Sequence, residues 1–506
     1  MLKKIIVAGL GLFITLLFAA DIKDGNLYLE MMLVKNRQIK IETAQNNSIE
    51  VREVLNPLGK TYFSNLTLEP YAVDGEIRYG IINRSEPTDS SIFYDDEDGQ
   101  INCKFVWESG KLDLRYEKLI FEDKYFSSRE EAEKYASETG YPLKLIRTIP
   151  MQNARIKVTT DKGETDYFQL PIQINTTSAV KINGIDCGDD LQCCHIKQSD
   201  SSLLVTFNLN IEAYLINVLP YEIGDTAPEE ALKAQAVAAR THAINLLLQN
   251  RHAGDGFDLC NTTHCQVYKF GLKHFPQVEE AVNETRGIVM EYDSLIADGV
   301  YHSNCGGRTE SNQNAWSGKP IPYLQGVACY PETDSLDLTV EANAVKWINT
   351  TRTTEGMASW ERRSEKWEQT ITKSALEQNT GGQNLQTLTV LKRGVSGRII
   401  KLKLSGSHDI ILEGEYQIRQ AFGGLPSSFF YFKNGANHSN STYILGDTLK
   451  IIGKGYGHGV GMCQVGALQK ARSGWTWRQI LSNYFPGVTF YSDWLNQPVQ
   501  DIEQRN

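Results

Sequence analysis

The sequence predicts a mixed α+β fold in which one central helix packs inside a largely β surround, with a β-rich segment ahead of it. Apolar and polar residues alternate loosely from Asn26 to Val54, a period that is typical of half-buried strands. The clearest helical pattern follows Thr226 and repeats apolar residues every three or four positions as far as Leu246. A length of 506 residues favours more than one domain.

Composition narrows the classes of function. The chain has 51 lysines and arginines against 61 aspartates and glutamates, which gives a net charge of −10. This balance argues against a general nucleic-acid binder, because a phosphate footprint needs clustered cations. With 41% hydrophobic and 22% charged residues, the chain has the composition of a globular protein and not of a disordered one.

Residues 1–20 have the three-part layout of a secretory signal. Lys3-Lys4 precede the apolar run Ile5–Leu17, and Ala19-Ala20 supply small residues at the cleavage point. The alternative is an uncleaved signal anchor, because the apolar run is near the lower length limit for spanning a bilayer. We therefore expect export to the periplasm, the cell wall or the extracytoplasmic face of the membrane. In that compartment the nine cysteines favour disulfides, and their odd number leaves at least one thiol unpaired or bound to metal.

Residues 21–175 are predicted to form an N-terminal β-rich accessory domain. The acidic stretch Tyr94–Gly99 suggests a solvated loop, Ser128 is placed to cap a short helix through Ala136, and Leu143–Ile149 returns to a strand. This strand–helix–strand pattern faintly resembles the glycan-binding SPOR repeat, whereas a plain β-rich domain is the simpler interpretation. A polar stretch at residues 175–179 marks the predicted boundary.

The central helix has clear end signals. Thr226 is a candidate N-cap, Pro228 suits the first helical position, and Glu229 and Glu230 complement the positive end of the helix. Alanines in its narrow apolar stripe would let another backbone approach closely. The stripe consists of Leu232, Ala236, Ala239, Ala243 and Leu246.

Two charged residues near this helix are candidates for chemistry. Glu222 lies in a segment, Leu219–Gly224, that is predicted to be a loop between the strand Leu203–Phe207 and the helix. Loops fixed by rigid elements often carry catalytic groups, although a surface residue without a role is the alternative. Arg240 lies beside the apolar stripe, where a structural ion pair with an acidic partner is favoured over a substrate contact.

A candidate metal site follows the helix. His252, Cys260, His264 and Cys265 place two thiols and two imidazoles within fourteen residues, enough for a tetrahedral zinc. A Cys260–Cys265 disulfide is an equal alternative in an exported protein.

Two glycine-rich segments, Tyr301–Glu310 and Gly453–Gln464, complete the candidate set. Neither contains the Gly-Lys-Ser/Thr ending of a phosphate loop, so nucleotide binding is disfavoured. Alternating glycines instead let the backbone come close to a bulky ligand. His302 and His458 would line such a cleft, and the alternative for each is a hydrogen-bonded structural histidine.

These segments together resemble the SpoIID/LytB family. Weaker similarity extends over about Ser178–Asp493 and leaves the N-terminal third outside, so residues 176–495 are expected to form the family's catalytic domain, followed by a polar tail at 496–506. The motifs that carry the resemblance are Glu222, Pro228–Thr241, Cys260–Gln266, Tyr301–Glu310 and Gly455–Ala467, with Ser396–Arg398 adding to it.

The resemblance implies work on peptidoglycan. SpoIID-like members are lytic transglycosylases that cut glycan strands lacking stem peptides, whereas LytB-like members are described as enhancers of a cell-wall amidase. The family's catalytic glutamate maps onto Glu222, although Ile223-Gly224 replace the Met-Pro that follows it in the family. A structural zinc is implied at Cys260 and Cys265 with His252 and His264. The resemblance implies glycan contacts at Arg240, His302, Ser303, Gly306, Gly307, Tyr456, His458 and Gln464.

Two cysteines depart from the family pattern. Cys305 and Cys463 stand where many members carry serine, and an extra bridge with Cys329 is one outcome, with the pairing left open.

A single carboxylate agrees with transglycosylase chemistry. Ordinary glycosidases use two carboxylates. In a transglycosylase the sugar's own 6-hydroxyl attacks, so one glutamate can protonate the leaving oxygen and then accept the hydroxyl proton.

Overall fold

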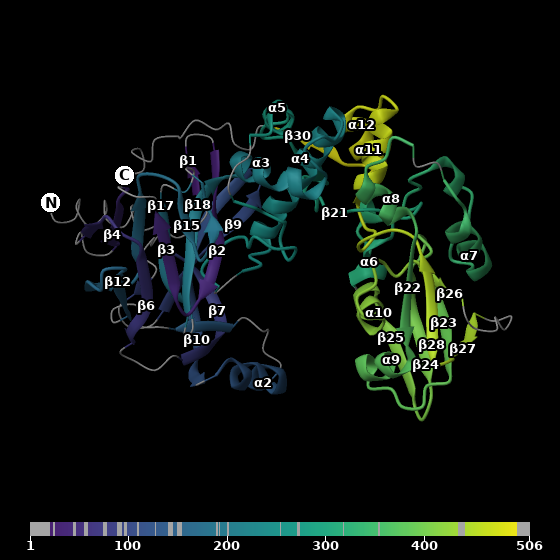
Figure 1. The fold of residues 1–506 in the computed structure, drawn as a ribbon, viewed down its shortest axis with the longest axis horizontal. Helices are drawn as coiled ribbons and strands as arrows, with labels where there is room; N and C mark the ends of the chain where they lie inside the picture. The colour runs from purple at the N-terminus through teal and green to yellow at the C-terminus, as the bar shows by residue number, and fades with distance from the viewer. Residues whose placement is uncertain are drawn as a thin grey trace. The chain divides into compact units, whose positions relative to one another are not determined.

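The computed structural model describes residues 21–492 except 24–25, 44–46, 55–58, 74–77, 89–93, 96–98, 109–110, 127, 140–144, 149–153, 189–190, 192, 200–201, 253–254, 271–273, 317, 353–354 and 434–440. The predicted signal segment lies outside these residues. The chain divides into two compact units, one formed by Met1–Tyr221, Ala243–Pro276 and Ser492–Asn506, the other by Glu222–His242 and Gln277–Tyr491. Helices and strands are mixed throughout, which confirms the α+β class (Figure 1).

A seven-stranded antiparallel sheet is the largest in the first unit. Leu27, Leu29, Met31 and Leu33 on β2 are buried, which confirms the alternating pattern expected from Asn26 onward. The strand predicted at Leu203–Phe207 is confirmed within β18. In spatial order the strands are β1 (Asp21–Lys23), β2 (Asn26–Asn36), β18 (Ser202–Asn210), β17 (Cys193–Ser199), β14 (Ile172–Thr176), β4 (Ile49–Glu53) and β5 (Gly59–Tyr62).

A six-stranded sheet in the same unit continues across the predicted domain boundary. Its strands are β13 (Thr165–Gln169), β12 (Ala154–Thr160), β6 (Leu66–Val73), β3 (Ile39–Thr43), β15 (Val180–Ile182) and β16 (Ile185–Asp186). β15 pairs with β3, while β14, which spans residue 175, pairs with β4 and β17. Backbone hydrogen bonds therefore cross this point of the chain, and the compact unit does not end there. The boundary assigned from the motifs stays a prediction.

The predicted strand–helix–strand segment belongs to a five-stranded sheet. Ser128 Oγ accepts from Glu131 N at 3.2 Å, as expected of the cap, and the helix extends to Thr139, beyond the predicted end at Ala136. The predicted loop Tyr94–Gly99 is wrong at its two ends, because Tyr94 and Asp95 pair with Gln100 and Gly99 as a hairpin. The elements are β11 (Leu145–Thr148), β7 (Arg78–Thr88), β10 (Lys111–Phe126), β9 (Gly99–Glu108), β8 (Tyr94–Asp95) and α2 (Arg129–Thr139).

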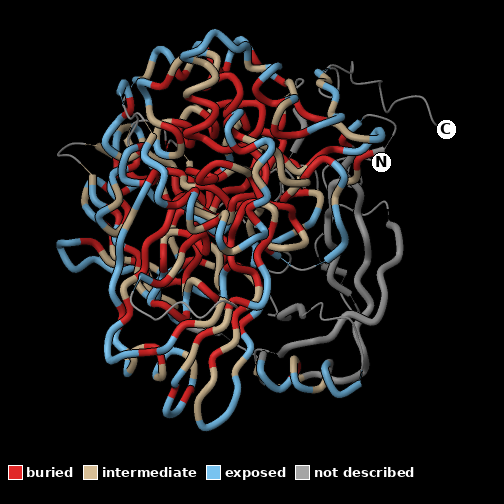
Figure 2. Tube along the Cα trace, turned by 90° about the vertical axis from the view of Figure 1, so that its right-hand side faces the viewer, coloured by how far each residue is buried: buried red, intermediate tan, exposed pale blue. Residues whose placement is uncertain are grey.

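The central helix is α4 (Glu229–Leu248). All five residues of the expected stripe are buried, and the helix therefore packs inside the fold as predicted. Burial is not confined to a narrow stripe, however, because every residue from Ala231 to Arg240 is buried. Small alanine side chains allow neighbouring segments to cover several faces of the helix at once. Figure 2 shows the buried positions gathered in the interior, with exposed positions at turns and loops.

Two apolar cores organise the second unit. The first core contains Ala234, Val237 and Ala238 of α4 and residues of the sheet β20 (Leu295–Ile296), β19 (Val289–Tyr292), β30 (Thr489–Tyr491). It also includes residues of α7 (Glu341–Asn349), α11 (Gln464–Arg472) and α12 (Trp477–Tyr484). The second core lies among two sheets and two helices. The three-stranded sheet has the order β22 (Trp367–Thr372), β28 (Thr448–Gly453), β26 (Phe430–Phe432), and the four-stranded sheet has the order β25 (Asp409–Glu413), β24 (Ile399–Ser405), β23 (Thr387–Arg393), β27 (Thr442–Ile444). The helices are α9 (Lys373–Thr380) and α10 (Glu415–Ala421).

The remaining elements of the second unit are short. They are α5 (Pro276–Glu284), β21 (Tyr301–His302), α6 (Asn312–Trp316), α8 (Ser359–Glu365) and β29 (Met462–Cys463), with two 3₁₀ turns at Pro322–Leu324 and Pro331–Thr333. Within the described part of the chain, no helix combines the length and the apolar character needed to cross a bilayer.

Candidate functional site

Glu222 ends the helix α3 (Ile211–Glu222) and does not lie in a loop. The predicted loop is therefore wrong at residues 219–222. Ile211, Tyr214 and Leu215 bury one side of the helix, and this tertiary burial outweighs the helix-breaking tendency of Pro220. Pro220 lies in the last turn of the helix and removes one intrahelical hydrogen bond, the one its own N–H would have donated.

The turn after Glu222 depends on a glycine. Gly224 has a φ of 95°, in the region where side chains on L-residues are strained. Proline, with φ fixed near about −65°, cannot adopt this conformation. The family's proline at position 224 would therefore be incompatible with the turn that this chain makes after Glu222.

The two glutamates nearest to Glu222 in the sequence have structural partners. Lys233 contacts the carboxylate of Glu229 and lies 3.3 Å from Glu230 Oε1. Glu230 Oε2 also accepts from Trp477 N at 2.5 Å. Both carboxylates thus fix the first turn of α4, as their place at the positive end of the helix led us to expect.

Arg240 is fully buried on α4. Its guanidinium donates to the carbonyl oxygens of Ile288, at 3.0 Å, and Val282, at 3.5 Å. These contacts give Arg240 the structural role that the sequence analysis favoured over a substrate contact. The expected acidic partner of Arg240 stays a prediction.

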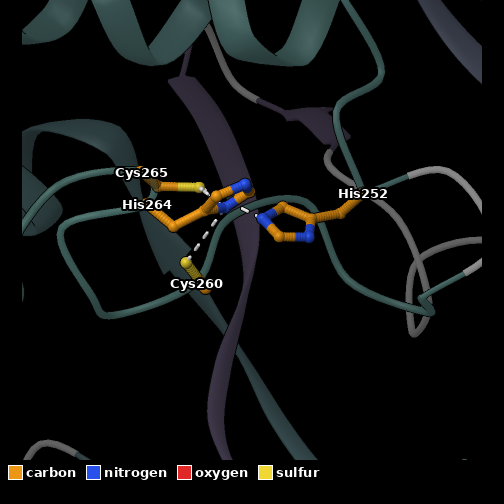
Figure 3. Close-up of side chains that lie close together, drawn as sticks. All are labelled: His252, Cys260, His264 and Cys265. Carbon is orange, nitrogen blue, oxygen red and sulfur yellow. Dashed lines mark hydrogen bonds between the residues drawn. The ribbon is translucent and has the colours of Figure 1, made fainter. Parts of the chain in front are cut away.

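The four residues of the candidate metal site converge. One nitrogen or sulfur atom from each of His252, Cys260, His264 and Cys265 lies within 4.8 Å of the others (Figure 3). His252 Nε2 lies 3.1 Å from Cys265 Sγ, and His264 Nδ1 lies 3.8 Å from both sulfurs. Both cysteines are free thiols in the structure, so the disulfide alternative is not what the geometry displays.

The loop that carries these residues is anchored to β2. Glu30 N donates to Asp258 Oδ2 at 2.7 Å, Met32 N donates to the carbonyl of Leu259 at 3.0 Å, and Asn261 Nδ2 donates to the carbonyl of Leu33 at 3.1 Å. The sheet therefore fixes the backbone on either side of Cys260.

Charge in the cluster is arranged as in a metal site. The hydrogen bond with Cys265 is the largest cause that lowers the pKa of Cys260 to about 2, and His252 and Thr262 add to it against burial. Burial lowers the pKa of His252, but hydrogen bonds with Asp255 and Cys260 outweigh it and raise this pKa to about 9. The lowered pKa of Cys260 favours the thiolate that binds metals, and a cation bound there would displace the proton that the raised pKa favours on His252.

Asp255 is a site residue to which the sequence gave no role. Its Oδ2 lies 2.9 Å from His252 Nδ1, which orients the other ring nitrogen toward the sulfurs. A carboxylate that holds a histidine in this way is the usual outer-shell support of a metal ligand. The donor set of two thiols and two imidazoles, with this support, fits zinc.

The two glycine-rich segments meet in the second unit. β21 and β29 pair in parallel, with Tyr301 opposite Met462 and His302 opposite Cys463. Asn304 and Tyr456 exchange two backbone hydrogen bonds of 3.0 and 2.8 Å. Residues more than 150 positions apart thus form one structure, which we call the glycine junction (residues 301–310 and 453–464).

Arg398 holds the glycine junction together. This guanidinium is fully buried and donates to the carbonyls of Cys305, at 2.9 Å, and Gly457, at 3.2 Å. Ser396 Oγ donates to Glu310 Oε2 at 2.5 Å. The Ser396–Arg398 segment, which added only weakly to the sequence resemblance, is therefore the clamp of this region.

Few of the residues expected to contact glycan are accessible. His302, Gly306, Gly307 and Gln464 are buried, Ser303 and His458 are partly buried, and Tyr456 is 52% exposed. The buried residues contact other parts of the protein. Gln464 Nε2 donates to Gln235 Oε1 at 3.2 Å, and a Cβ added at Gly307 would lie 2.5 Å from Trp347 Nε1.

An exposed aromatic that the sequence did not single out lies at the junction. Trp316 is 48% exposed, and its ring centroid is 4.8 Å from that of His458. No motif signalled Trp316, because α6 reaches His458 only through the fold.

Known proteins match the same part of the chain. The family described as stage II sporulation protein matches residues 199–292, which include Glu222 and all four residues of the metal cluster. A domain of unknown function matches residues 310–461.

Several curated proteins are similar over more than half of the chain. An uncharacterised protein of Brachyspira hyodysenteriae is 30% identical over 326 residues, 64% of this chain and 78% of that protein. The amidase enhancer of Bacillus subtilis is 30% identical over 308 residues, 55% of this chain and 40% of the enhancer. Stage II sporulation protein D of Bacillus subtilis is 27% identical over 313 residues, 56% of this chain and 74% of that protein. With the motifs in the same order and these relatives, the chain belongs to the SpoIID/LytB family.

Proposed function

We propose that this protein is a peptidoglycan lytic transglycosylase that cleaves glycan strands free of stem peptides, with Glu222 as its single acid/base residue. The observation that carries the proposal is the place of Glu222, at the end of α3 and seven residues before α4, inside the segment that matches the family. Glu229 and Glu230, its nearest rivals, are engaged with Lys233.

One carboxyl group is sufficient for the reaction. Protonated Glu222 would give its proton to the glycosidic oxygen as the bond to the muramic C1 breaks. The 6-hydroxyl of the same sugar would attack C1, and the Glu222 carboxylate would take the hydroxyl proton. The products are a 1,6-anhydro-muramic end and a free hydroxyl on the leaving sugar. The reaction therefore needs neither a water molecule nor a second carboxylate.

Zinc at His252, Cys260, His264 and Cys265 is proposed to be structural. The two thiols and two imidazoles fill a tetrahedral coordination sphere and leave no open position for substrate. Bound there, the metal would supply a crosslink that fixes the loop after α4 to the sheet.

Exposed aromatic side chains support glycan binding at the glycine junction. Trp316 and Tyr456 present about half of their surface to solvent, and Trp316 lies against His458. Aromatic rings with one accessible face supply rigid apolar contact area, as the faces of a sugar ring require.

A second candidate function is the enhancement of a separate N-acetylmuramoyl-L-alanine amidase. The observation in its favour is the relative named amidase enhancer, which is 30% identical although this chain matches only 40% of its length. In that role the protein would bind glycan strands and a cell-wall amidase without cleaving. Both roles place it outside the cytoplasm, as the N-terminal segment predicts.

The test is Glu222→Gln, assayed on purified glycan strands without stem peptides. We expect the wild type to release 1,6-anhydro-muramic ends and the variant to lose about 10²–10⁴-fold or more in rate, because Gln has no transferable proton. Its melting temperature and glycan pull-down should be unchanged. Glu229→Gln is the matched control, since it removes a 62%-exposed carboxylate seven residues away and should leave cleavage near the wild-type rate.

Two results would contradict the proposal. Cleavage by Glu222→Gln at the wild-type rate would move the acid/base role to another residue. A wild-type protein that forms no anhydro ends but accelerates a cell-wall amidase would establish the enhancer role instead.

A further inference from the structure

Three cysteines that lie far apart in the sequence meet in the core of the second unit. Cys305 follows β21, Cys329 precedes the 3₁₀ turn at residues 331–333, and Cys463 lies on β29. All three are buried and have free thiols. Cys305 N donates to Cys463 Sγ at 3.2 Å. Cys329 Sγ lies at the same turn, because a Cβ added to Gly466 would be 2.2 Å from it and Gly466 N donates to Cys463 Sγ at 3.3 Å. We call these residues the thiol cluster.

A histidine offers a fourth donor. Ligand atoms of His302, Cys305 and Cys463 lie within 4.8 Å of one another. His302 Nδ1 lies 3.0 Å from the carbonyl of Val460, so this nitrogen carries the hydrogen and Nε2 keeps its lone pair. His302 is 4% exposed, and its Nε2 has no hydrogen-bond partner among the residues that the structure describes. A metal-binding histidine has this same arrangement, in which one ring nitrogen donates to a carbonyl and the other faces the metal.

Polar groups contact each of the three sulfurs. Gly307 N donates to Cys305 Sγ, and Gly466 N, in the first turn of α11, donates to Cys463 Sγ, each at 3.3 Å. Tyr484 Oη lies 2.9 Å from Cys329 Sγ. Hydrogen bonds to sulfur and a helix N-terminus both favour the thiolate, which is the form that binds metals.

Two cations lie beside the cluster. The buried guanidinium of Arg398 donates to the carbonyl of Cys305 at 2.9 Å, and Lys470 Nζ donates to the carbonyl of Cys329 at 3.1 Å. Three thiolates with one divalent ion carry a net charge of about −1, which the guanidinium can offset.

We propose that Cys305, Cys329, Cys463 and His302 form a second metal site, which holds a structural zinc ion independently of the first cluster. Binding releases three thiol protons and forms three Zn–S bonds and one Zn–N bond, with no change of oxidation state. A disulfide would use two of the three sulfurs and leave one thiol and the His302 Nε2 unused, whereas the metal uses all four donors.

The site also accounts for the odd number of cysteines. Of the nine, two belong to the first cluster and three to the thiol cluster, which leaves the even number of four at 103, 187, 193 and 194. The role of the second ion would be to tie β21 and β29 of the glycine junction to the segment before residue 331.

Metal content of the full chain, purified without added metal, tests this site. We expect two zinc ions per chain in the wild type and one in Cys305→Ser/Cys463→Ser. Cys187→Ser, which removes a buried free thiol elsewhere, is the matched control and should keep both ions. Cys260→Ser should also lose one ion, and its failure to do so would count against the first cluster and not against the second.

A second measurement on the wild type keeps the test sharp if the double variant does not fold. We expect alkylation under native conditions to spare Cys305, Cys329 and Cys463, and peptide mapping without reduction to find no disulfide among them. Replacement by cobalt should give the thiolate-to-metal absorption of a sulfur-rich tetrahedral site with an intensity above that of the Cys260 cluster alone. A disulfide between any two of the three cysteines, or one zinc ion per chain in both the wild type and the double variant, would overturn the proposal.

Discussion

Gly299→Ala should move the central helix and weaken both the fold and the activity. Gly299 lies just before Val300, where the chain passes α4 closely. A Cβ added at Gly299 would lie 2.3 Å from the carbonyl oxygen of Ala238 and 3.1 Å from Thr241 Cβ. The close approach therefore requires a glycine at residue 299, and it occurs at Ala238 and Thr241, which lie outside the alanine stripe expected from the sequence.

The magnitude follows from that overlap. An ordinary contact of a Cβ atom is about 3.4 Å or longer, so α4 and the Gly299 segment must separate by roughly 1 Å. Overpacking a core costs about 1–3 kcal/mol, and the obstructing atom here is the backbone of a helix, which cannot rotate away. We therefore expect a loss near 3 kcal/mol in the free energy of unfolding. A shift of about 1 Å near catalytic groups can also lower the rate by about 10²-fold.

Urea denaturation and the release of anhydro ends measure the two effects. Gly446→Ala is the control, because the nearest atom to its added Cβ, the carbonyl oxygen of Thr448, is 3.9 Å away. That change should be neutral or stabilise the protein by up to about 1 kcal/mol. Equal midpoints and equal cleavage rates for the two variants would show that α4 is not held against residue 299, and would refute the reasoning.

Two further predictions concern metal and pH. Removal of zinc from the Cys260 cluster by chelation, or the change Cys265→Ser, should lower the melting temperature, because the metal binds the folded loop better than the unfolded one. A melting temperature that does not change with chelator would contradict this prediction. Burial, with Lys197 adding to it, lowers the pKa of His195 to about 3, so the native protein keeps this imidazole neutral. Its contribution to stability is complete above about pH 6.5, where the unfolded imidazole is neutral too, and is lost by about 1.4 kcal/mol per pH unit as the pH falls from about 6.5 toward 3. Urea titrations at several pH values should give a shallower acid slope for His195→Asn than for the wild type, and identical slopes would refute the assignment.

The elements that could be predicted from the sequence are those specified by residues close together in the chain. The alternation of β2 and the cap of α2 each depend on residues within a few positions, and each was found at its expected place. α4 begins at Glu229, one residue after the predicted start, because the carbonyl of Pro228 accepts the first helical hydrogen bond. α3 was missed because Pro220 and Gly224 suggested a loop, whereas the burial of Tyr214 and Leu215 extends the helix to Glu222. Pairing across the predicted boundary at residue 175 could not be foreseen either, since β15 meets a strand, β3, more than 130 residues earlier.

The two candidate metal sites also differ in how far the sequence could predict them. Four metal donors within fourteen residues are visible in the sequence because a short loop forces them together. The thiol cluster draws its cysteines from three separate segments, and no spacing rule brings Cys305, Cys329 and Cys463 to one point. The pairing of β21 with β29 places His302 beside Cys463, and the hydrogen bond from Cys329 N to the carbonyl of Gly307 brings in the third cysteine.

The alternating glycines of the glycine junction serve a different purpose from the one expected. They were expected to admit a bulky ligand, but a Cβ at Gly459 would lie 2.5 Å from Arg398 Cζ, and one at Gly461 would lie 2.1 Å from the carbonyl oxygen of Val300. Each glycine thus makes room for another part of the protein. Under the proposed function, a glycan strand would contact side chains at the surface of the junction, where Tyr456 and Trp316 are exposed aromatic groups. Arg398 and the thiol cluster are buried, and we expect them to hold that surface rigid, which would lower the entropic cost of binding an extended polymer.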